Sequence, residues 1–278
     1  MATVLLGLAS ALTWGAADFG GGLLTRRTPV FGVVLVSQLV GTAIALVLAV
    51  VRGEGAPTTA DLAWSLLGGL AGGIGVIALY QALAIGRMGV VAPVTGVIAA
   101  LIPVAAGILL EGVPAPLVLV GIGLAVAAVI LVSRVRDDRV APSGLALALV
   151  AGVSLGTLGV ILAQVSEGHA FGPLTIIRVT EAVLTGAVIV VSRSAWRPER
   201  RLVPAISAVG VLDMAGNGAF ILAIQSGALA VAAVLSSLYP VTTVILAAIV
   251  LHERVTRTHA VGIGLAVVAI VCIAAGST

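Results

Sequence analysis

Apolar stretches of about 20 residues, the length of helix that crosses roughly 30 Å of hydrocarbon, follow one another along almost the whole chain. Short polar segments separate them. The pattern predicts ten membrane-spanning helices. They are expected near residues 3–24, 29–51, 61–85, 90–110, 115–133, 142–165, 171–192, 202–225, 228–251 and 256–276.

Composition agrees with this pattern. Hydrophobic residues make up 60% of the chain, charged residues only 9%, and the mean hydropathy is +1.28. A soluble domain needs more polar surface than this, and the loops are too short to fold into a separate domain. We therefore expect an all-α integral membrane protein that crosses the cell (inner) membrane several times, with the lipid bilayer as its main partner.

The basic residues predict the orientation of the chain. All fourteen are arginines, and twelve fall in the loops after the first, third, fifth, seventh and ninth predicted helices. Arg52 is the only one in an opposite loop, and Arg178 lies inside a helix. By the positive-inside rule, the arginine-rich loops face the cytoplasm and both termini lie outside it. The positive charge is thus a topology signal and does not indicate nucleic-acid binding.

The second half of the chain repeats the first. The hexapeptide GIGLAV occurs at 121–126 and again at 262–267. Around it, LEGV matches HERV, ALIPV matches SLYPV, and LVSQLV matches RVTEAV; the matched ranges are 110–113 and 252–255, 100–104 and 237–241, and 35–40 and 178–183. The last match aligns Gln38 with Glu181. The sequence predicts two five-helix repeats, 1–138 and 139–278. Because five is odd, the second repeat must be inverted in the membrane.

Inverted repeats are common in secondary transporters, which hold the substrate near the midplane between the two halves. The sequence also resembles the drug/metabolite transporter superfamily, specifically proteins with two EamA-type domains. The resemblance rests on WGAADF in the first helix, on proline-centred fourth and ninth helices, and on the stretch 238–271, LYPVTTVILAAIVLHERVTRTHAVGIGLAVVAIV. It implies a central cavity, peripheral fifth and tenth helices, and efflux or exchange of small metabolites.

Charged residues inside the membrane are the main candidates for function. A charge at the centre of a membrane helix costs about 2.5–3.5 kcal/mol on insertion scales, so it must be paired, hydrated or useful. Asp213 lies near the middle of its helix, and Asn217 projects from the same face one turn later. Arg178 and Glu181 lie three residues apart. They form either a structural ion pair or a substrate clamp, and Arg178 can also reach Asp213.

Further candidates surround these charges. Trp14 and Asp18 share one face of the first helix, and Gln38, Tyr80 and Tyr239 are expected to line the same path. Pro103 and Pro240 are expected near the centres of the fourth and ninth helices, where they would act as matched hinges. Glu111 and Glu253, which end these two helices, are expected to be structural.

The sequence does not favour an enzyme. Its three histidines are scattered, no spacing typical of metal ligands occurs, and no nucleophile motif is present. We expect no metal and no cofactor. The predicted function is a secondary transporter that exports or exchanges a small metabolite, such as an amino acid or related compound, by alternating access. A proton or a counter-solute is a candidate co-substrate. The alternative is a non-transporting receptor or accessory subunit built on a transporter fold. The oligomeric state is left open.

The orientation can be tested with a reporter fused after Thr278. We expect an alkaline phosphatase fusion to be active and a green fluorescent protein fusion to be dark, because the arginine distribution places this terminus outside the cytoplasm. Members of the family that the sequence resembles are often drawn with cytoplasmic termini, the reverse of this expectation. The opposite pattern of reporter activity would contradict our assignment.

Overall fold

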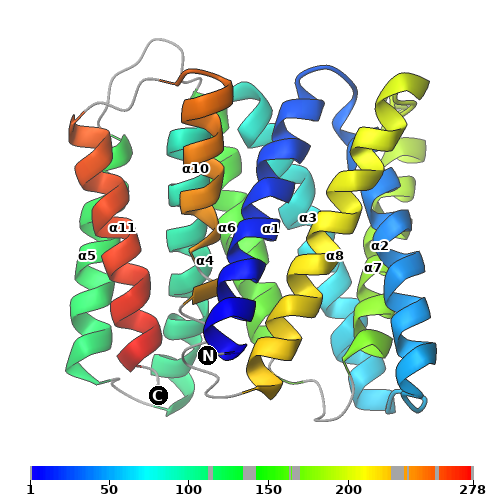
Figure 1. Cartoon of the computed structure of the whole chain (residues 1–278), viewed down its shortest axis with the longest axis horizontal. Helices are drawn as coiled ribbons and strands as arrows, with labels where there is room; N and C mark the ends of the chain where they lie inside the picture. Colours follow the sequence, from blue (N-terminus) through cyan, green and yellow to red (C-terminus); the bar gives the residue numbers. More distant parts are fainter. Residues whose placement is uncertain are drawn as a thin grey trace.

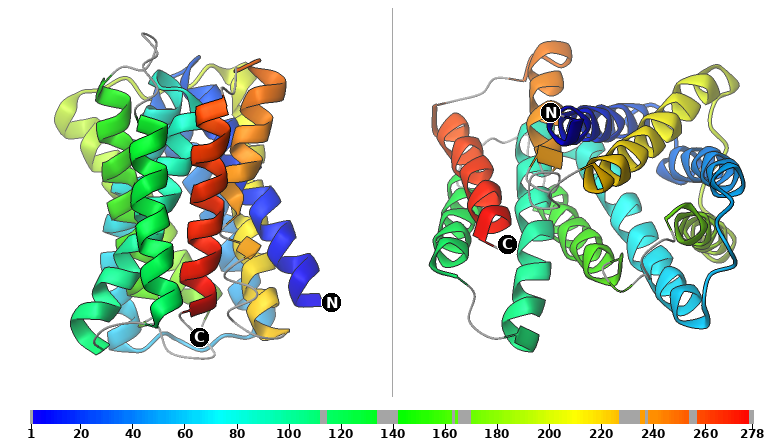
Figure 2. Two further views of the ribbon diagram at one scale, coloured as in Figure 1. Left: turned by 90° about the vertical axis from the view of Figure 1, so that its left-hand side faces the viewer. Right: turned by 60° about the horizontal axis from the view of Figure 1, so that its bottom comes forward.

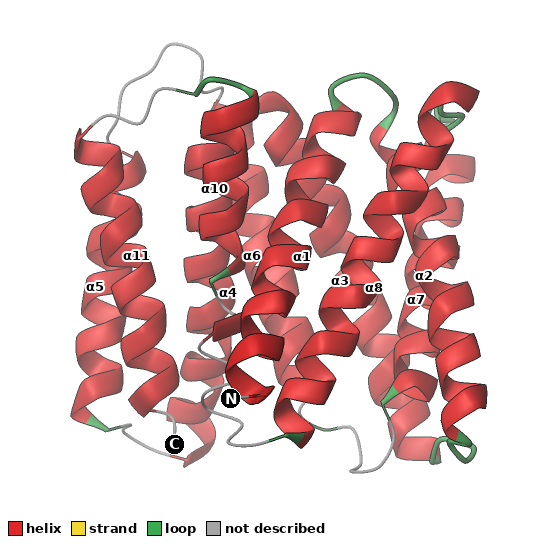
Figure 3. Ribbon diagram, in the orientation of Figure 1, coloured by secondary structure: helices red, strands yellow, loops and turns green. Residues whose placement is uncertain are grey.

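The computed structural model describes residues 2–111, 115–133, 142–162, 164, 170–226, 235–236, 238–253 and 257–276. The described residues form α-helices and one short 3₁₀ helix, with no strand among them (Figure 3). In the first half of the chain the helices are α1 (Ala2–Thr25), α2 (Val30–Arg52), α3 (Thr59–Ile85), α4 (Met88–Glu111) and α5 (Pro116–Ser133). In the second half they are α6 (Pro142–Leu162), α7 (Phe171–Ser192), η1 (Arg200–Leu202), α8 (Val203–Gln225), α10 (Tyr239–Val250) and α11 (Arg257–Gly276).

The all-helical expectation is confirmed, and most helix bounds fall within a few residues of those predicted. Among the described residues, six helices are long and apolar enough to cross a membrane: α1, α2, α3, α6, α7 and the η1–α8 segment. Shorter apolar helical stretches lie in α4, α5, α10 and α11. The largest departure is in the ninth predicted span, because α10 begins at Tyr239 and residues 227–234 and 237 lie outside the described part. The count of ten spans therefore stays a prediction.

Local chemistry explains where several helices begin and end. α3 begins with a capping box: the Thr58 hydroxyl accepts from the Asp61 backbone N–H at 3.1 Å, and the Asp61 carboxylate accepts from the Thr58 N–H at 3.1 Å. These bonds satisfy N–H groups that have no partner inside the helix. α2 ends at Arg52 and is capped by Gly53, whose φ of 64° is a left-handed conformation that glycine adopts without steric cost.

The helices pack side by side, and both chain ends lie at the same end of the bundle (Figure 1). Large apolar side chains cover the outer surface; Val51 and Val191, for example, are 76% and 85% exposed. Such an apolar exterior suits a lipid environment rather than water. α5 and α11 pack together at one edge, away from α2, α7 and α8 (Figures 1 and 2). The GIGLAV repeats therefore lie inside two peripheral helices, and Ala125 and Ala266 are buried where these helices meet.

Contacts between the two halves come in exchanged pairs. α1 packs on α8, and α6, which corresponds to α1 in the second half, packs on α3. Likewise α2 packs on α8 as α7 packs on α3, and α10 packs on α1 as α4 packs on α6. Three further contacts, α2 with α7, α4 with α10 and α5 with α11, each join equivalent helices of the two halves. Exchanging the halves leaves each of these pairs unchanged. This is the pattern that a two-fold relation between the halves produces.

Glycines permit the closest of these contacts. A Cβ at Gly152 in α6 would lie 2.6 Å from Ile98 Cβ and 2.9 Å from the Thr95 carbonyl oxygen of α4. Real Cβ atoms do not approach this closely, so only glycine fits. The Thr95 hydroxyl also donates to the Ala148 carbonyl of α6 at 3.2 Å. Small residues and such cross-helix bonds hold helices together in membranes, where water provides no hydrophobic driving force between them.

This packing predicts opposite effects for two glycine substitutions. Gly152→Ala should destabilise the protein by about 1–3 kcal/mol, because α4 and α6 must move apart to admit the methyl group. Gly264→Ala in α11 should be neutral or stabilising, because no atom lies within 4 Å of the new Cβ and alanine favours helix. Thermal unfolding in one detergent measures both variants. Equal unfolding temperatures would contradict the packing argument.

Candidate functional site

The guanidinium of Arg178 is the centre of a buried polar network. Its Nη1 donates to Gln38 Oε1 at 2.9 Å and to Glu181 Oε2 at 3.0 Å. Its Nη2 donates to the Asp213 carboxylate in a short ion pair. The sequence left open whether Arg178 pairs with Glu181 or Asp213. In the structure it pairs with both, so one cation connects α2, α7 and α8.

Accessibility differs sharply within the network. The side chains of Arg178 and Glu181 are 9% and 1% exposed, whereas that of Asp213 is 30% exposed. Glycine makes room for the buried acid, because a Cβ at Gly72 of α3 would collide with the Glu181 carboxylate. Glu181 is thus held in a fixed position, and Asp213 is the most exposed of the three charged side chains.

Two of the residues that bind Arg178 are equivalent in the internal repeat. Gln38 of α2 and Glu181 of α7, which align in the repeat, accept hydrogen bonds from the same nitrogen. When equivalent residues of two repeats meet on one atom, that atom lies where the repeats face each other. In transporters built from inverted repeats, this is the region that holds substrate.

Asn217, Asp18 and Tyr80 extend the network. The Asn217 amide donates to the Asp213 carbonyl oxygen at 2.8 Å and to Asp213 Oδ2 at 3.4 Å, one helical turn away as expected. The Asp18 carboxylate of α1 is close enough to Asp213 for the two charges to repel. Tyr80 of α3 is 5% exposed and lies near Asp18, Asp213, Arg178 and Glu181. The structure therefore brings these predicted residues together.

An aromatic cluster adjoins the charges. The Trp14 ring lies 5.6 Å from that of Phe220 and 6.4 Å, edge to face, from that of Tyr239. A Cβ at Gly216 would overlap the Trp14 indole, so α1 and α8 approach closely here. Tyr239 also lies near Asp18. These rings connect α1, α8 and α10 beside the acidic side chains.

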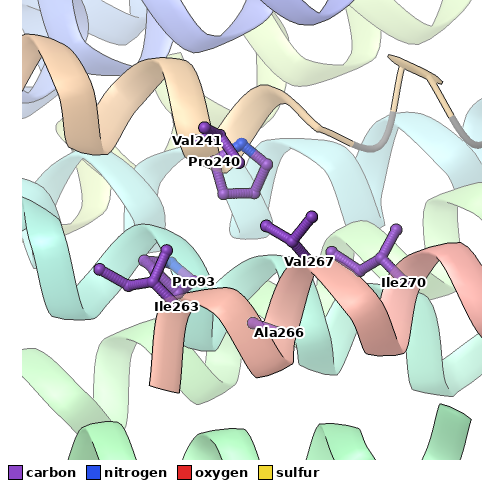
Figure 4. Close-up of a pocket in the computed structure, with 7 residues that line it drawn as sticks. All are labelled: Pro93, Pro240, Val241, Ile263, Ala266, Val267 and Ile270. Carbon is purple, nitrogen blue, oxygen red and sulfur yellow. The ribbon is translucent and has the colours of Figure 1, made fainter. Parts of the chain in front are cut away.

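Pro103 and Pro240 occupy different places in the described helices. Pro240 is the second residue of α10, where its missing N–H costs no hydrogen bond, and is not at the centre of a described helix. Pro103 lies inside α4, which is helical on both sides of it. Pro240 faces Pro93 of α4 across an apolar pocket, lined by Pro93, Pro240, Val241, Ile263, Ala266, Val267 and Ile270 (Figure 4). A hinge role for either proline remains a prediction.

Sequence reasoning missed Pro93 although a signal was present. Pro-Val-Thr occurs at 93–95 and at 240–242, and this shared tripeptide is the signal that could have selected Pro93. It also missed the cross-repeat contacts of Glu54 and Arg26. The side chain of Glu253, expected to be structural, accepts bonds from the first turn of α4. The side chain of Glu111 lies outside the described residues. Within the described part of the chain, no His, Cys, Asp and Glu cluster could hold a metal ion.

These features define a class: a multi-pass helical membrane protein with a buried charge network between two related halves. Comparison with known families gives the same result. The EamA-like transporter family matches residues 1–134 and 142–275, and the chain belongs to this family. Among solved structures, one recorded only as "Crystal structure of protein" has a TM-score of 0.66 at 18% identity, over 98% of this chain and 96% of that one. This likeness shows the fold alone. None of the curated proteins compared with the chain matches it.

The network makes a prediction about stability. Arg178→Gln should destabilise the protein by about 3–5 kcal/mol, because it leaves buried carboxylate without its cation. Adding Glu181→Gln and Asp213→Asn should restore much of the loss. Thermal unfolding of the purified variants measures this, with Arg27→Gln, at an exposed position, as the matched control. Strictly additive losses in the triple variant would show that the three charges do not act as a unit.

Proposed function

We propose that this protein is a secondary transporter that exports or exchanges a small metabolite across the cell membrane by alternating access. The observation that carries the proposal is the Arg178 network, which joins the two halves and leaves Asp213 partly exposed. Membership of a transporter family supports the class of activity. The proposed substrate and mechanism rest on the arrangement of the helices and on the charges around Arg178.

The helix arrangement supports inverted five-helix repeats. Arg26, just after α1, donates to the Gly86 carbonyl oxygen at 3.1 Å, and a Cβ at Gly144, near the start of α6, would lie 3.4 Å from Gly86 Cα. α1 therefore ends where its counterpart α6 begins, so the two run in opposite directions. Together with the exchanged contacts, this favours two inverted halves that rock about a shared site. We place the arginine-rich end in the cytoplasm and both termini outside it.

The chemistry of the network favours a zwitterionic substrate such as an amino acid. A substrate carboxylate can replace one of the two carboxylates that bind Arg178. The substrate ammonium can then bind the carboxylate that was displaced, or Asp18. Both exchanges keep every buried charge paired, which is the condition for moving charge through a low-dielectric interior. A cation or an anion alone would satisfy only one half of the network.

The same charges provide a place for a coupling proton. Among the described residues, the carboxylates of Glu181 and Asp213 bind the single guanidinium of Arg178, and the Asp18 carboxylate lies near Asp213. Excess negative charge in the membrane is costly, so a proton or an ammonium must compensate it. The chain contains no lysine, and therefore no phosphate-binding loop of the kind that ends in Gly-Lys. Energy then comes from an ion gradient, from counter-exchange or from the gradient of the solute.

Asp213→Asn tests this function. The change keeps the shape and hydrogen bonding of the side chain but removes the charge that pairs with Arg178. In proteoliposomes we expect flux of radiolabelled amino acids to fall at least tenfold, or to lose its response to a pH gradient, while the protein purifies as a single species.

Two comparisons make the test decisive. Glu199→Gln, in an exposed ion pair with Arg201, is the matched control and should transport normally. Wild-type flux and pH response in Asp213→Asn would overturn the assigned role of Asp213. Saturable binding by the wild type without flux, across a screen of metabolites, would instead indicate a receptor.

A further inference from the structure

Two carboxylates, at opposite ends of the bundle, each bind the N-terminus of a helix. Glu253, just after α10, accepts from the Met88 N–H at 3.2 Å and the Gly89 N–H at 3.0 Å, in the first turn of α4. Glu54, just after α2, accepts from the N–H groups of Phe171 and Gly172 at 2.9 and 2.8 Å, where α7 begins. A carboxylate at a helix N-terminus makes charge-assisted bonds to free N–H groups and interacts favourably with the helix dipole.

Each carboxylate comes from the half that does not contain the helix it binds. Glu253 belongs to the second repeat and α4 to the first, and the bonded residues are 164 and 165 positions apart. Glu54 belongs to the first repeat and α7 to the second. Helix caps are usually provided by the residue just before the helix. Here the caps instead join the two halves of the molecule, once at each end.

Arginines reinforce both contacts. Arg26 Nη2 lies 3.8 Å from Glu253 Oε1 and also donates to the carbonyl oxygens of Leu83 and Gly86 at 3.1 Å each. At the other end, Arg52 Nε lies 3.7 Å from Glu54 Oε1, and its guanidinium stacks over the Phe171 ring at 5.6 Å. The Glu253 and Glu54 side chains are only 13% and 5% exposed. Both contacts are thus largely closed to solvent.

The backbone before Glu253 is held in an uncommon conformation. His252 has a φ of 53°, in the left-handed region that residues with a Cβ rarely adopt. The turn ends α10, and the Glu253 N–H donates back to the Ala247 carbonyl oxygen at 3.4 Å. This turn directs the Glu253 side chain toward α4. A residue placed here only to end the helix would not need to reach the other half of the chain.

We propose that Glu253 and Glu54 are two latches that hold the repeats together at opposite ends and open in alternation; the inference rests on the proposed transport function. Alternating access requires the halves to separate at one end while staying joined at the other. A bond that joins them only at one end stabilises every state closed at that end. Both latches are formed in this structure, which therefore corresponds to a state closed at both ends.

Distance measurements between spin labels test the latches without substrate. In a Cys272→Ser background, which removes the only cysteine, one pair of labels goes at Ile85 and Ile249, near the Glu253 latch. A second pair goes at Val51 and Leu222, at the end of the bundle that holds the Glu54 latch, where Ile221 of α8 packs with Ala49 and Phe171. All four positions are exposed. Glu253→Gln should raise the long-distance population of the first pair about tenfold, equivalent to about 1.4 kcal/mol, and leave the second unchanged. Glu54→Gln should do the converse.

The controls separate the latch from ordinary helix capping. Glu199→Gln should alter neither distance. Arg26→Gln, which leaves the Glu253 cap in place, should have a smaller effect at the first pair only, and it decides the matter if Glu253→Gln does not purify as a single species. Unchanged distances in both glutamate variants, or equal broadening of both pairs in either one, would overturn the proposal. Because the readout is independent of flux, a protein that opens as expected but moves no solute would keep the latches and refute transport.

Discussion

A cation buried in an apolar bundle must be neutralised by neighbouring groups, and the centre of this protein is built around that requirement. The Arg178 side chain is 9% exposed, and its partners come from α2, α7 and α8. Since removing one partner would strand a charge, these three helices cannot separate or rotate freely. Glycine at position 72 admits the Glu181 carboxylate, so the glycine-rich packing of the helices and the charge network depend on each other.

Away from this network the molecule uses very little polar chemistry between helices. Small side chains allow the backbones to approach, and a few hydroxyls donate across the contacts, as Thr243 does to the Gly15 carbonyl oxygen of α1 at 3.1 Å. The outer surface is apolar. Charge is therefore concentrated at the centre, where the halves meet, and at the two ends, where Glu54 and Glu253 bind helix N-termini. The two halves are therefore held together strongly at the centre and at both ends of the bundle, and weakly in between.

The sequence alone determined the helices, the repeat and the choice of candidate residues. Apolar runs set by the thickness of a bilayer gave most helix bounds, and the GIGLAV copies identified two equivalent peripheral helices. The cost of intramembrane charge was enough to select Arg178, Glu181 and Asp213, because so few charged residues lie inside the helices. These inferences depend on local length and on composition, both of which can be read along one chain.

Only the tertiary structure decided which of these residues meet. It showed that Arg178 binds Glu181, Asp213 and Gln38 together, that Pro240 faces Pro93, and that Glu253 caps α4. The physical reason is that these helices are apolar on all sides, so periodicity does not reveal which face turns inward. Contacts between residues more than a hundred positions apart depend on how glycines let whole helices approach, and that is a property of the packed bundle.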